Sequence, residues 1–239
     1  MNPENIRELT DDKVLVWVID QAPVMIDWRD YLTILSPKEQ TRAGKFAFEK
    51  LQRRFVFRRA ALRGLLGHYL GLEPKQVGIE LEEYGKPALA AAHQECRIHF
   101  NLSTSEDFAI IGITKERELG VDIEYLNRLA DYEKIAQRFF SPVEVTAFQN
   151  LPEEQHLEGF YNCWTRKEAF IKAIGQGLGY PLKDFDVALK PGEPPKVLRV
   201  EGGDVNNWKL AAFTPTKDFS AAVAAAGGDW ELEVIQFIW

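Results

Sequence analysis

Two segments of the chain carry its most informative patterns: G-V-D-I-E at residues 120–124 and W-T-R-K-E-A-F-I-K-A at residues 164–173. The first segment has the composition of a strand. Because side chains alternate along a strand, Asp122 and Glu124 should share one side while the apolar residues between them face a core. The second segment has the composition of a helix, on which Glu168 and Lys172 are four residues apart and share one face. One strand and one helix can thus offer three carboxylates and an ammonium group.

Three carboxylates that meet in a partly buried site repel one another unless a cation lies between them. Mg²⁺ prefers oxygen ligands and is usually held by a few carboxylates together with substrate phosphates. Asp122, Glu124 and Glu168 are therefore candidate metal ligands, and Lys172 is a candidate phosphate contact. The alternatives are an edge strand with one solvated side and an ordinary surface ion pair between Glu168 and Lys172, worth ~0.3–0.5 kcal/mol.

The composition limits the functional classes. The chain has 239 residues, 46% of them hydrophobic and 27% charged, which is typical of a globular protein of one large or two small domains. A formal net charge of -7 argues against general nucleic-acid binding, which needs a basic surface. The two cysteines, Cys96 and Cys163, form no C-x-x-C pair and fit a reducing cytoplasm. No apolar run predicts a membrane span, and the first residues lack the order of a signal peptide.

The region before these segments is predicted to contain a buried strand at 14–20, a helix that begins at Ser36-Pro37, and a long helix over 49–70. Leu51 is among the residues expected in the apolar stripe of the long helix. Its basic residues form two rows: Lys50, Arg54 and Arg58 on one face, and Arg59 and Arg63 on another. Most of these residues are expected on a solvated face. Arg54 is the exception, because it borders the apolar stripe and can direct its guanidinium onto a phosphate.

Two further segments contain residues that could bind a phosphate group. In Y-G-K-P at residues 84–87, the glycine and proline fix a turn, so Lys86 is a candidate phosphate ligand; an exposed turn lysine is the alternative. The segment F-N-L-S-T-S at 100–105 predicts a strand that runs into a hydroxyl-rich loop, which can bind an anion or simply form a turn.

The remainder of the chain is predicted to form helices over 131–140, from Ser141-Pro142 onward and over 157–174, followed by strands that form an antiparallel sheet as far as Ile238. Phe139 and Phe140 are expected in the core or at a partner-protein contact. No P-loop, G-x-S-x-G or H-E-x-x-H motif is present, and no sequence repeat marks two halves of the chain.

Taken in order, Y-G-K-P, F-N-L-S-T-S, G-V-D-I-E, R-F-F-S-P-V-E at 138–144 and W-T-R-K-E-A-F-I-K-A resemble the motifs of the Sfp-type 4'-phosphopantetheinyl transferases. These enzymes move the phosphopantetheine arm of coenzyme A (CoA) onto a serine of a carrier protein. The resemblance covers roughly residues 36–190. It implies an α+β fold of two similar α/β halves with pseudo-two-fold symmetry and an active site in the cleft between them. Residues 1–119 would form the half that binds the CoA phosphates, and residues 120–239 the half with the metal ligands and the signature helix.

The resemblance also implies roles for individual residues. Asp122, Glu124 and Glu168 would hold Mg²⁺, with Mn²⁺ as an alternative, and Glu168 and Lys172 would be catalytic. Contacts to CoA are implied for Arg42, Arg54, Lys86, Ser103, Thr104 and Lys172. The partners would be apo acyl or peptidyl carrier proteins, with no nucleic acid or membrane involved, and the enzyme would be a cytoplasmic monomer. Fatty-acid, polyketide and nonribosomal-peptide carriers all stay open.

Three positions depart from the family pattern, and two of them, Thr104 and Glu39, lie at the nucleotide end of CoA. Thr104 stands where the family usually has His, Glu39 where it has Lys, and Glu106 where it has a small residue. Either CoA binds more weakly at this end, or another cation compensates. Thr104 and Glu39 keep open a non-catalytic module that binds CoA or a carrier protein. A third possibility is a Mg²⁺-dependent transferase that acts on a different pyrophosphate nucleotide.

Overall fold

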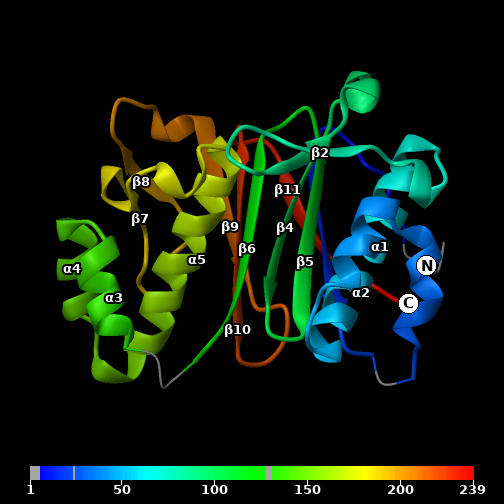
Figure 1. Cartoon of the computed structure of the whole chain (residues 1–239). Helices are drawn as coiled ribbons and strands as arrows, with labels where there is room; N and C mark the ends of the chain where they lie inside the picture. The colour runs from blue at the N-terminus through cyan, green and yellow to red at the C-terminus, as the bar shows by residue number, and fades with distance from the viewer. Residues whose placement is uncertain (1–5, 24, 128–130) are drawn as a thin grey trace.

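Two β-sheets lie side by side at the centre of the molecule (Figure 1). The computed structural model describes residues 6–23, 25–127 and 131–239. The first sheet has the order β11-β1-β5-β4 and the second the order β6-β10-β9. Their strands are β11 (Glu231–Gln236), β1 (Lys13–Asp20), β5 (Phe108–Lys115), β4 (Ile98–Ser105), β6 (Leu119–Tyr125), β10 (Phe219–Ala226) and β9 (Trp208–Phe213). Two small hairpins pair β2 (Ile79–Leu81) with β3 (Pro87–Leu89) and β7 (Phe185–Val187) with β8 (Val197–Val200).

The two halves of the chain follow the same order of elements. Each runs from one strand through helices to a small hairpin and then to an antiparallel strand pair, so that β1-β5-β4 corresponds to β6-β10-β9. The helices of the first half are η2 (Trp28–Ile34), α1 (Pro37–Ala43) and α2 (Glu49–Leu70), and those of the second are α3 (Tyr132–Phe139), α4 (Pro142–Gln149) and α5 (His156–Ile174). Short 3₁₀ turns lie at η3 (Pro74–Gln76), η4 (Ala91–Cys96), η5 (Glu153–Gln155), η6 (Gly177–Gly179), η7 (Leu182–Asp184) and η8 (Val205–Asn207). The mixed α+β class is confirmed, while the pseudo-two-fold axis stays a prediction.

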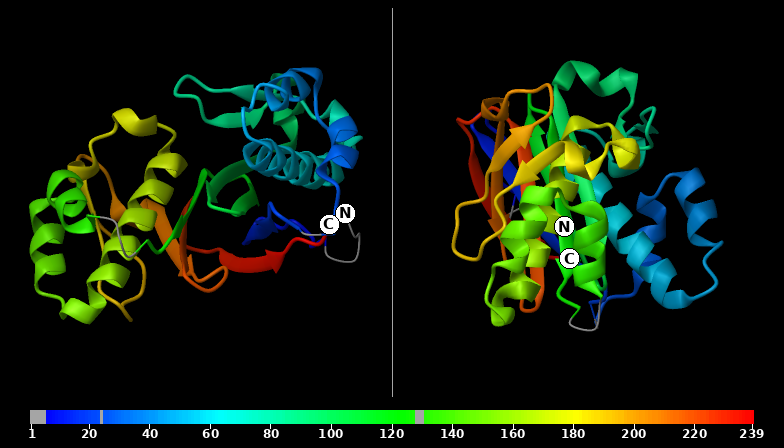
Figure 2. Two further views of the ribbon diagram at one scale, coloured as in Figure 1. Left: turned by 60° about the horizontal axis from the view of Figure 1, so that its bottom comes forward. Right: turned by 90° about the vertical axis from the view of Figure 1, so that its left-hand side faces the viewer.

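The last strand departs from the predicted antiparallel arrangement. β11 pairs in parallel with β1, from Lys13 opposite Glu231 to Val18 opposite Gln236, so the end of the chain returns to the sheet of the first half. Figure 2 shows this strand, in red, beside the dark blue β1. Parallel pairing to a strand more than 200 residues away leaves no local sequence signal. The predicted boundary between residues 119 and 120 falls at the start of β6 and is still a prediction.

Three of the four apolar clusters in the described residues give the molecule its layers, and the fourth packs η2 and α1 against the first half of α2. Of the three, one lies between α2 and the first sheet, one between the two sheets, and one between the second sheet and the helices α3, α4 and α5. Helices α2 and α5 therefore cover the two outer faces, as Figures 1 and 2 show. Gly71 ends α2 in the left-handed conformation expected of its position. Leu51, which was predicted in the core, is 42% exposed at the first turn of α2. No helix in the described ranges is both long and apolar enough to cross a membrane.

Helix α5 contacts β6 through its backbone at Gly120. A Cβ atom on Gly120 would lie 2.0 Å from the carbonyl oxygen of Ala169 and 2.3 Å from the backbone nitrogen of Ala173. Only glycine allows strand and helix to approach this closely. The contact places the turn of α5 that carries Glu168 and Lys172 directly beside the strand that carries Asp122.

Candidate active site

Strand β4 connects the two sheets through alternate side chains. Asn101, Ser103 and Ser105 share one side of β4, and this side faces β6 of the other sheet. The backbone N–H of Val121 donates to the Asn101 side-chain oxygen at 2.9 Å, and that of Tyr125 donates to Ser105 Oγ at 3.0 Å. The alternation N-x-S-x-S thus supplies the hydrogen bonds that hold β4 against β6, a role that sequence reasoning did not assign to it.

Asp122 lies at the centre of this junction and is 3% exposed. Its Oδ1 accepts hydrogen bonds from Ser103 Oγ at 2.8 Å and from Lys172 Nζ at 2.6 Å, and Lys172 also donates to Ser103 Oγ at 3.0 Å. Within the described part of the chain, no group donates to the second oxygen, Oδ2, which is buried. A buried carboxylate oxygen without a partner costs about 1–3 kcal/mol or more, so this atom is suited to accept a cation or a hydrogen-bond donor.

The surrounding carboxylates are destabilised in their charged forms. Burial raises the pKa of Asp122 despite the opposing effect of Lys172. Burial, followed by the charge of Asp122, raises the pKa of Glu124 to about 7, although Ser105 donates to Glu124 Oε2 at 3.1 Å. The same two causes, in the same order, raise the pKa of Glu168. A bound cation would relieve the desolvation and the mutual repulsion of all three groups.

Glu168 and Lys172 both line a cavity of about 230 Å³ between the two halves. The cavity is bounded by Tyr84, Gly85, Lys86 and Pro87 of the β2–β3 turn, Asn101 and Leu102 of β4, and Glu168, Ile171, Lys172, Gly175 and Gly177 in and after α5. The Y-G-K-P turn and the signature helix, 80 residues apart in the sequence, therefore meet at one site. Lys86 lies 3.6 Å from a carboxylate oxygen of Glu118, so its ammonium already has an anionic neighbour.

The three predicted metal ligands are coupled by charge but are not gathered around one point. Across residues 6–23, 25–127 and 131–239, no three His, Cys, Asp or Glu side chains form a group that could hold a metal ion. Lys172 Nζ binds the Oδ1 atom of Asp122, where a cation would otherwise have access. The unpartnered Asp122 Oδ2, together with the raised pKa values of Glu124 and Glu168, nevertheless gives a donor set with the chemistry that Mg²⁺ prefers.

A buried ion pair holds α5 in position from the opposite side. Lys167, which is 0% exposed, lies 2.8 Å from Glu144 Oε2 and donates to the carbonyl oxygens of Leu182 and Phe185, each at 2.7 Å. Glu144 also completes a capping box with Ser141 at the start of α4. In the sequence K-E at 167–168, the lysine therefore points into the second half and the glutamate toward the cavity. Sequence reasoning found the helix start at Ser141-Pro142 but missed the ion pair.

The predicted nucleotide end is arranged differently from expectation. Arg54 does direct its guanidinium onto acceptors, but these are Asp107 at 2.8 Å and Glu106 at 3.0 Å in the β4–β5 turn. Thr104 is exposed near the end of β4. Arg42 makes no ion pair with Glu106 or Asp107 among the described residues. Its guanidinium carbon instead lies over the Phe55 ring, 5.4 Å from the ring centroid.

The expectation of a solvated basic face is wrong for Arg59 and Arg63. Arg63 is 3% exposed, and both guanidinium groups form ion pairs with Glu39. Glu39 in turn caps α1, where its carboxylate accepts from the backbone N–H of Ser36. Glu39 is therefore neutralised within the protein.

Phe140 is buried, and its ring stacks on that of Phe160 in the core.

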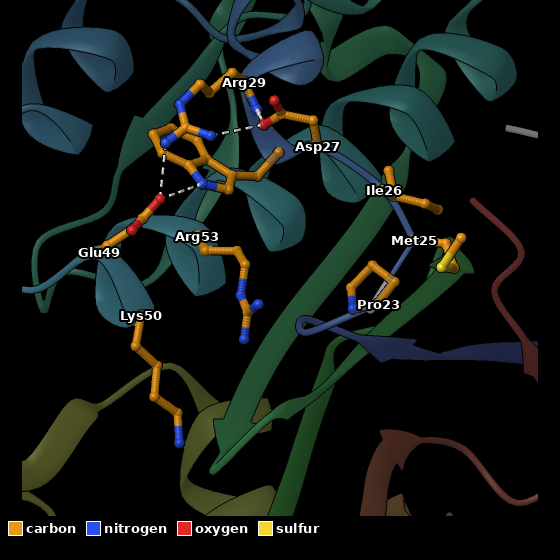
Figure 3. Close-up of a pocket in the computed structure, with 9 residues that line it drawn as sticks. Pro23, Met25, Ile26, Asp27, Arg29, Glu49, Lys50 and Arg53 are labelled. Carbon is orange, nitrogen blue, oxygen red and sulfur yellow. Dashed lines mark hydrogen bonds and ion pairs between the residues drawn. The ribbon is translucent and has the colours of Figure 1, made fainter.

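A larger and more open cavity of about 620 Å³ lies at the start of α2 (Figure 3). Figure 3 shows Lys50 and Arg53 extending from α2 on one side of it, while Arg29 forms ion pairs with Asp27 and Glu49. None of the three candidate metal ligands lines this cavity. The smaller cavity is therefore the candidate active site.

Comparisons with known proteins match both halves. Residues 118–224 match the 4'-phosphopantetheinyl transferase superfamily, and residues 20–116 match the 4'-phosphopantetheinyl transferase N-terminal family. The chain is 38% identical to the 4'-phosphopantetheinyl transferase HetI of Nostoc sp. over 229 residues, which cover 96% of this chain and 94% of that protein. It is 33% identical to a 4'-phosphopantetheinyl transferase of Bacillus subtilis, over 70% of this chain and 80% of that protein. A Bacillus anthracis holo-(acyl-carrier-protein) synthase in complex with CoA aligns with 46% of this chain and 94% of its own, at 23% identity and a TM-score of 0.39.

Proposed function

This chain belongs to the 4'-phosphopantetheinyl transferase superfamily, and from that premise we propose the reaction that its site performs. The enzyme transfers the 4'-phosphopantetheine group of CoA to a serine hydroxyl of an apo acyl or peptidyl carrier protein. The serine oxygen forms a bond to the β-phosphorus of the CoA pyrophosphate, and the bond from that phosphorus to the bridging oxygen breaks. Adenosine 3',5'-bisphosphate leaves, and the serine proton passes to Glu168, directly or through a water molecule.

One observation carries the proposal of a metal-dependent reaction: the buried Oδ2 of Asp122 has no donor in the described structure, at the point where the two halves meet. Asp122, Glu124 and Glu168 would hold Mg²⁺, with Mn²⁺ as a substitute. A bound Mg²⁺ would supply positive charge to the pyrophosphate as negative charge builds on the leaving group. The low dielectric that raises the pKa values of these carboxylates would also strengthen their attraction for the ion.

The protein's own groups orient the substrate and accept the proton. Lys172 faces the cavity and shares its ammonium with Ser103 and Asp122, which fixes a positive charge where pyrophosphate oxygens would lie. Lys86 approaches the cavity from the β2–β3 turn and would contact a CoA phosphate. Burial raises the pKa of Glu168, which brings this carboxylate closer to the working pH of a proton acceptor.

The roles predicted for Arg54, Arg42 and Thr104 stay proposals at the nucleotide end of CoA. The ion pairs of Arg54 with Glu106 and Asp107 weaken the case for that residue. Both halves of one chain contribute to the site, which supports a monomeric enzyme, and the two cysteines are free thiols, as expected in a reducing cytoplasm. Size-exclusion chromatography with light scattering tests the oligomeric state.

The test is the intact mass of apo carrier proteins of the fatty-acid, polyketide and nonribosomal-peptide types after incubation with the enzyme, CoA and Mg²⁺. We expect a gain of one phosphopantetheine, lost when Mg²⁺ is chelated and reduced at least about 100-fold in rate by Glu168→Ala. Glu158→Gln is the matched control, because Glu158 lies exposed on the same helix, outside the cavity lining. If no carrier gains mass while CoA still binds by calorimetry, the transferase proposal fails and a CoA-binding module replaces it.

A further inference from the structure

Two arginines of the first half carry charges that no carboxylate in the described structure neutralises. Arg42 of α1 and Arg58 of α2 both lie over the ring of Phe55, with guanidinium carbons 5.4 and 5.3 Å from its centroid. Among the described residues, neither makes an ion pair with a carboxylate, whereas the neighbouring Arg54 and Arg59 both do. Two cations are thus held on one buried ring without a counter-ion.

The charged form of Arg58 is destabilised in the isolated protein. Burial, together with the charges of Arg59, Arg42 and Arg54, lowers the pKa of Arg58 to about 10. The nearby acidic group, Glu39, is already bound by Arg59 and Arg63 and is not free to compensate. An arrangement that concentrates positive charge at a cost in folding free energy is typical of a site that binds an anionic ligand.

The position of Arg58 relative to β4 follows from the packing of α2. Lys50 and Arg54 occupy the same helix face as Arg58 and reach Asp107 in the β4–β5 turn, at 3.5 and 2.8 Å. Tyr69, near the other end of α2, and Ile98, at the start of β4, line a third cavity together. The C-terminal end of α2 therefore lies near the start of β4, and helix and strand run in opposite directions. Arg58 lies one helical turn, about 5.4 Å, beyond Arg54.

One helical turn corresponds to about two residues of strand. Because Arg54 pairs with Glu106, Arg58 lies level with Thr104, two residues earlier on β4. The α2-facing side of β4 carries Phe100 and Leu102, which pack in the core beneath α2, and Thr104 is the next residue on that side. Ser103 points to the opposite side, toward Asp122 and Lys172. One step along β4 thus separates the arginine pair from the carboxylate site.

CoA has two separate phosphate centres, a pyrophosphate and a 3'-phosphate on the ribose. Since the proposed reaction places the pyrophosphate at Asp122 and Lys172, the second centre remains for the arginine pair. We propose that Arg58 and Arg42, supported by the Phe55 ring, bind the 3'-phosphate of CoA and take over the cationic role that Thr104 and Glu39 do not fill. This inference rests on the proposed function, because it assumes that CoA is the substrate.

Calorimetric titration of the full chain with CoA and with dephospho-CoA, which lacks only the 3'-phosphate, tests the assignment. We expect unchanged protein to bind CoA at least about tenfold more tightly, since a charge-assisted hydrogen bond is typically worth that much or more. Arg58→Met keeps an apolar side chain over Phe55 and should bring the ratio of the two dissociation constants close to 1. Its affinity for dephospho-CoA should be unchanged, and Arg58→Lys should restore part of the ratio.

Lys45→Met is the matched control, because it removes one positive charge from an exposed position near α1 and should leave the ratio as it is. If Arg58→Met folds, as circular dichroism would show, and still prefers CoA to the same degree as unchanged protein, the assignment is overturned while the proposed function stands. If unchanged protein binds CoA but does not distinguish it from dephospho-CoA, the assignment is overturned as well. If folded, unchanged protein binds neither compound, the proposed function fails, and the assignment fails with it.

Discussion

Replacing Gly120 with alanine should separate the two parts of the active site without removing any functional group. The added Cβ would lie 2.0 Å from the carbonyl oxygen of Ala169 and 2.3 Å from the backbone nitrogen of Ala173, and real Cβ atoms essentially never approach closer than 3.0 Å. Both contacts are with helix backbone, so no side chain can rotate away. Helix α5 must therefore shift from β6 by about 1 Å or more.

This shift acts directly on the proposed catalytic groups, because Glu168 and Lys172 are each next in sequence to a residue in the clash. Lys172 Nζ lies 2.6 Å from Asp122 Oδ1 and 3.0 Å from Ser103 Oγ, and about 1 Å of extra separation takes both contacts outside hydrogen-bonding range. Misplacement of this size typically reduces the rate about 100-fold. Overpacking also costs about 1–3 kcal/mol, which for a chain of this length lowers Tm by roughly 2–12 °C.

The assay is the initial rate of carrier-protein modification by intact mass, measured at least 20 °C below the midpoint of thermal unfolding so that the variant is fully folded. Gly44→Ala serves as the control, because its Cβ would meet nothing closer than 3.7 Å and Gly44 already has a helical backbone conformation. We expect Gly44→Ala to retain both rate and Tm. A Gly120→Ala variant with an unchanged rate and an unchanged Tm would refute the idea that backbone contact between β6 and α5 sets the geometry of the site.

Three further predictions follow from other parts of the structure. Glu144→Gln leaves the ammonium of Lys167 buried without an anion and should lower the free energy of unfolding by about 3–5 kcal/mol in urea titrations; an unchanged midpoint would contradict this. Because the folded-state pKa of Glu124 is raised from 4.5 to about 7, its contribution to stability is present below pH 4.5 and is lost as pH rises through 7. Metal-free protein should thus gain stability from pH 8 to pH 5 more than Glu124→Gln does, and equal pH profiles of Tm would argue against it. Arg54→Met should destabilise the β4–β5 turn yet keep the preference for CoA over dephospho-CoA, whereas loss of that preference would return the phosphate-binding role to Arg54.

Features that depend on neighbouring residues could be predicted from the sequence. Alternation in 120–124 placed Asp122 and Glu124 on one side of β6, and helical spacing placed Glu168 and Lys172 on one face of α5. The helix starts predicted at Ser36 and Ser141 are likewise present, and each is closed by a capping box between residues three apart. The apolar pattern specified β1, α2 and α5 for the same reason.

Contacts between distant segments could not be predicted in this way. Nothing near Glu231 indicates that β11 pairs with β1, and nothing near Arg54 indicates that Glu106 and Asp107 will neutralise it. The burial of Lys167 could not be predicted either. Lys167 and Glu168 are adjacent charged residues on α5, and the sequence does not show which of the two faces the interior. Such contacts depend on which faces of the helices meet which sheets, and that information comes only from the assembled fold.

The two capping boxes also reveal a correspondence between the halves that the sequence analysis missed. S-P-K-E at 36–39 opens α1 and S-P-V-E at 141–144 opens α4, and in each half the glutamate caps its own helix and also pairs with a basic residue of the long helix that follows. Glu39 binds Arg59 and Arg63 of α2, just as Glu144 binds Lys167 of α5.

This correspondence explains why Glu39 need not weaken CoA binding. A glutamate engaged as a helix cap and by two guanidinium groups presents little negative charge to a nearby phosphate. Glu39 therefore holds α1 against α2. In the assignment proposed above, Arg58 and Arg42 take the cationic role that the resemblance implies for this position. Arg58 lies one residue before Arg59 on α2, so the ion pairs that occupy Glu39 also fix the helix that presents Arg58 and Phe55 to Arg42. Glu39→Gln should accordingly reduce the preference for CoA over dephospho-CoA, although it removes a negative charge; an increase in that preference would show that Glu39 repels the phosphate.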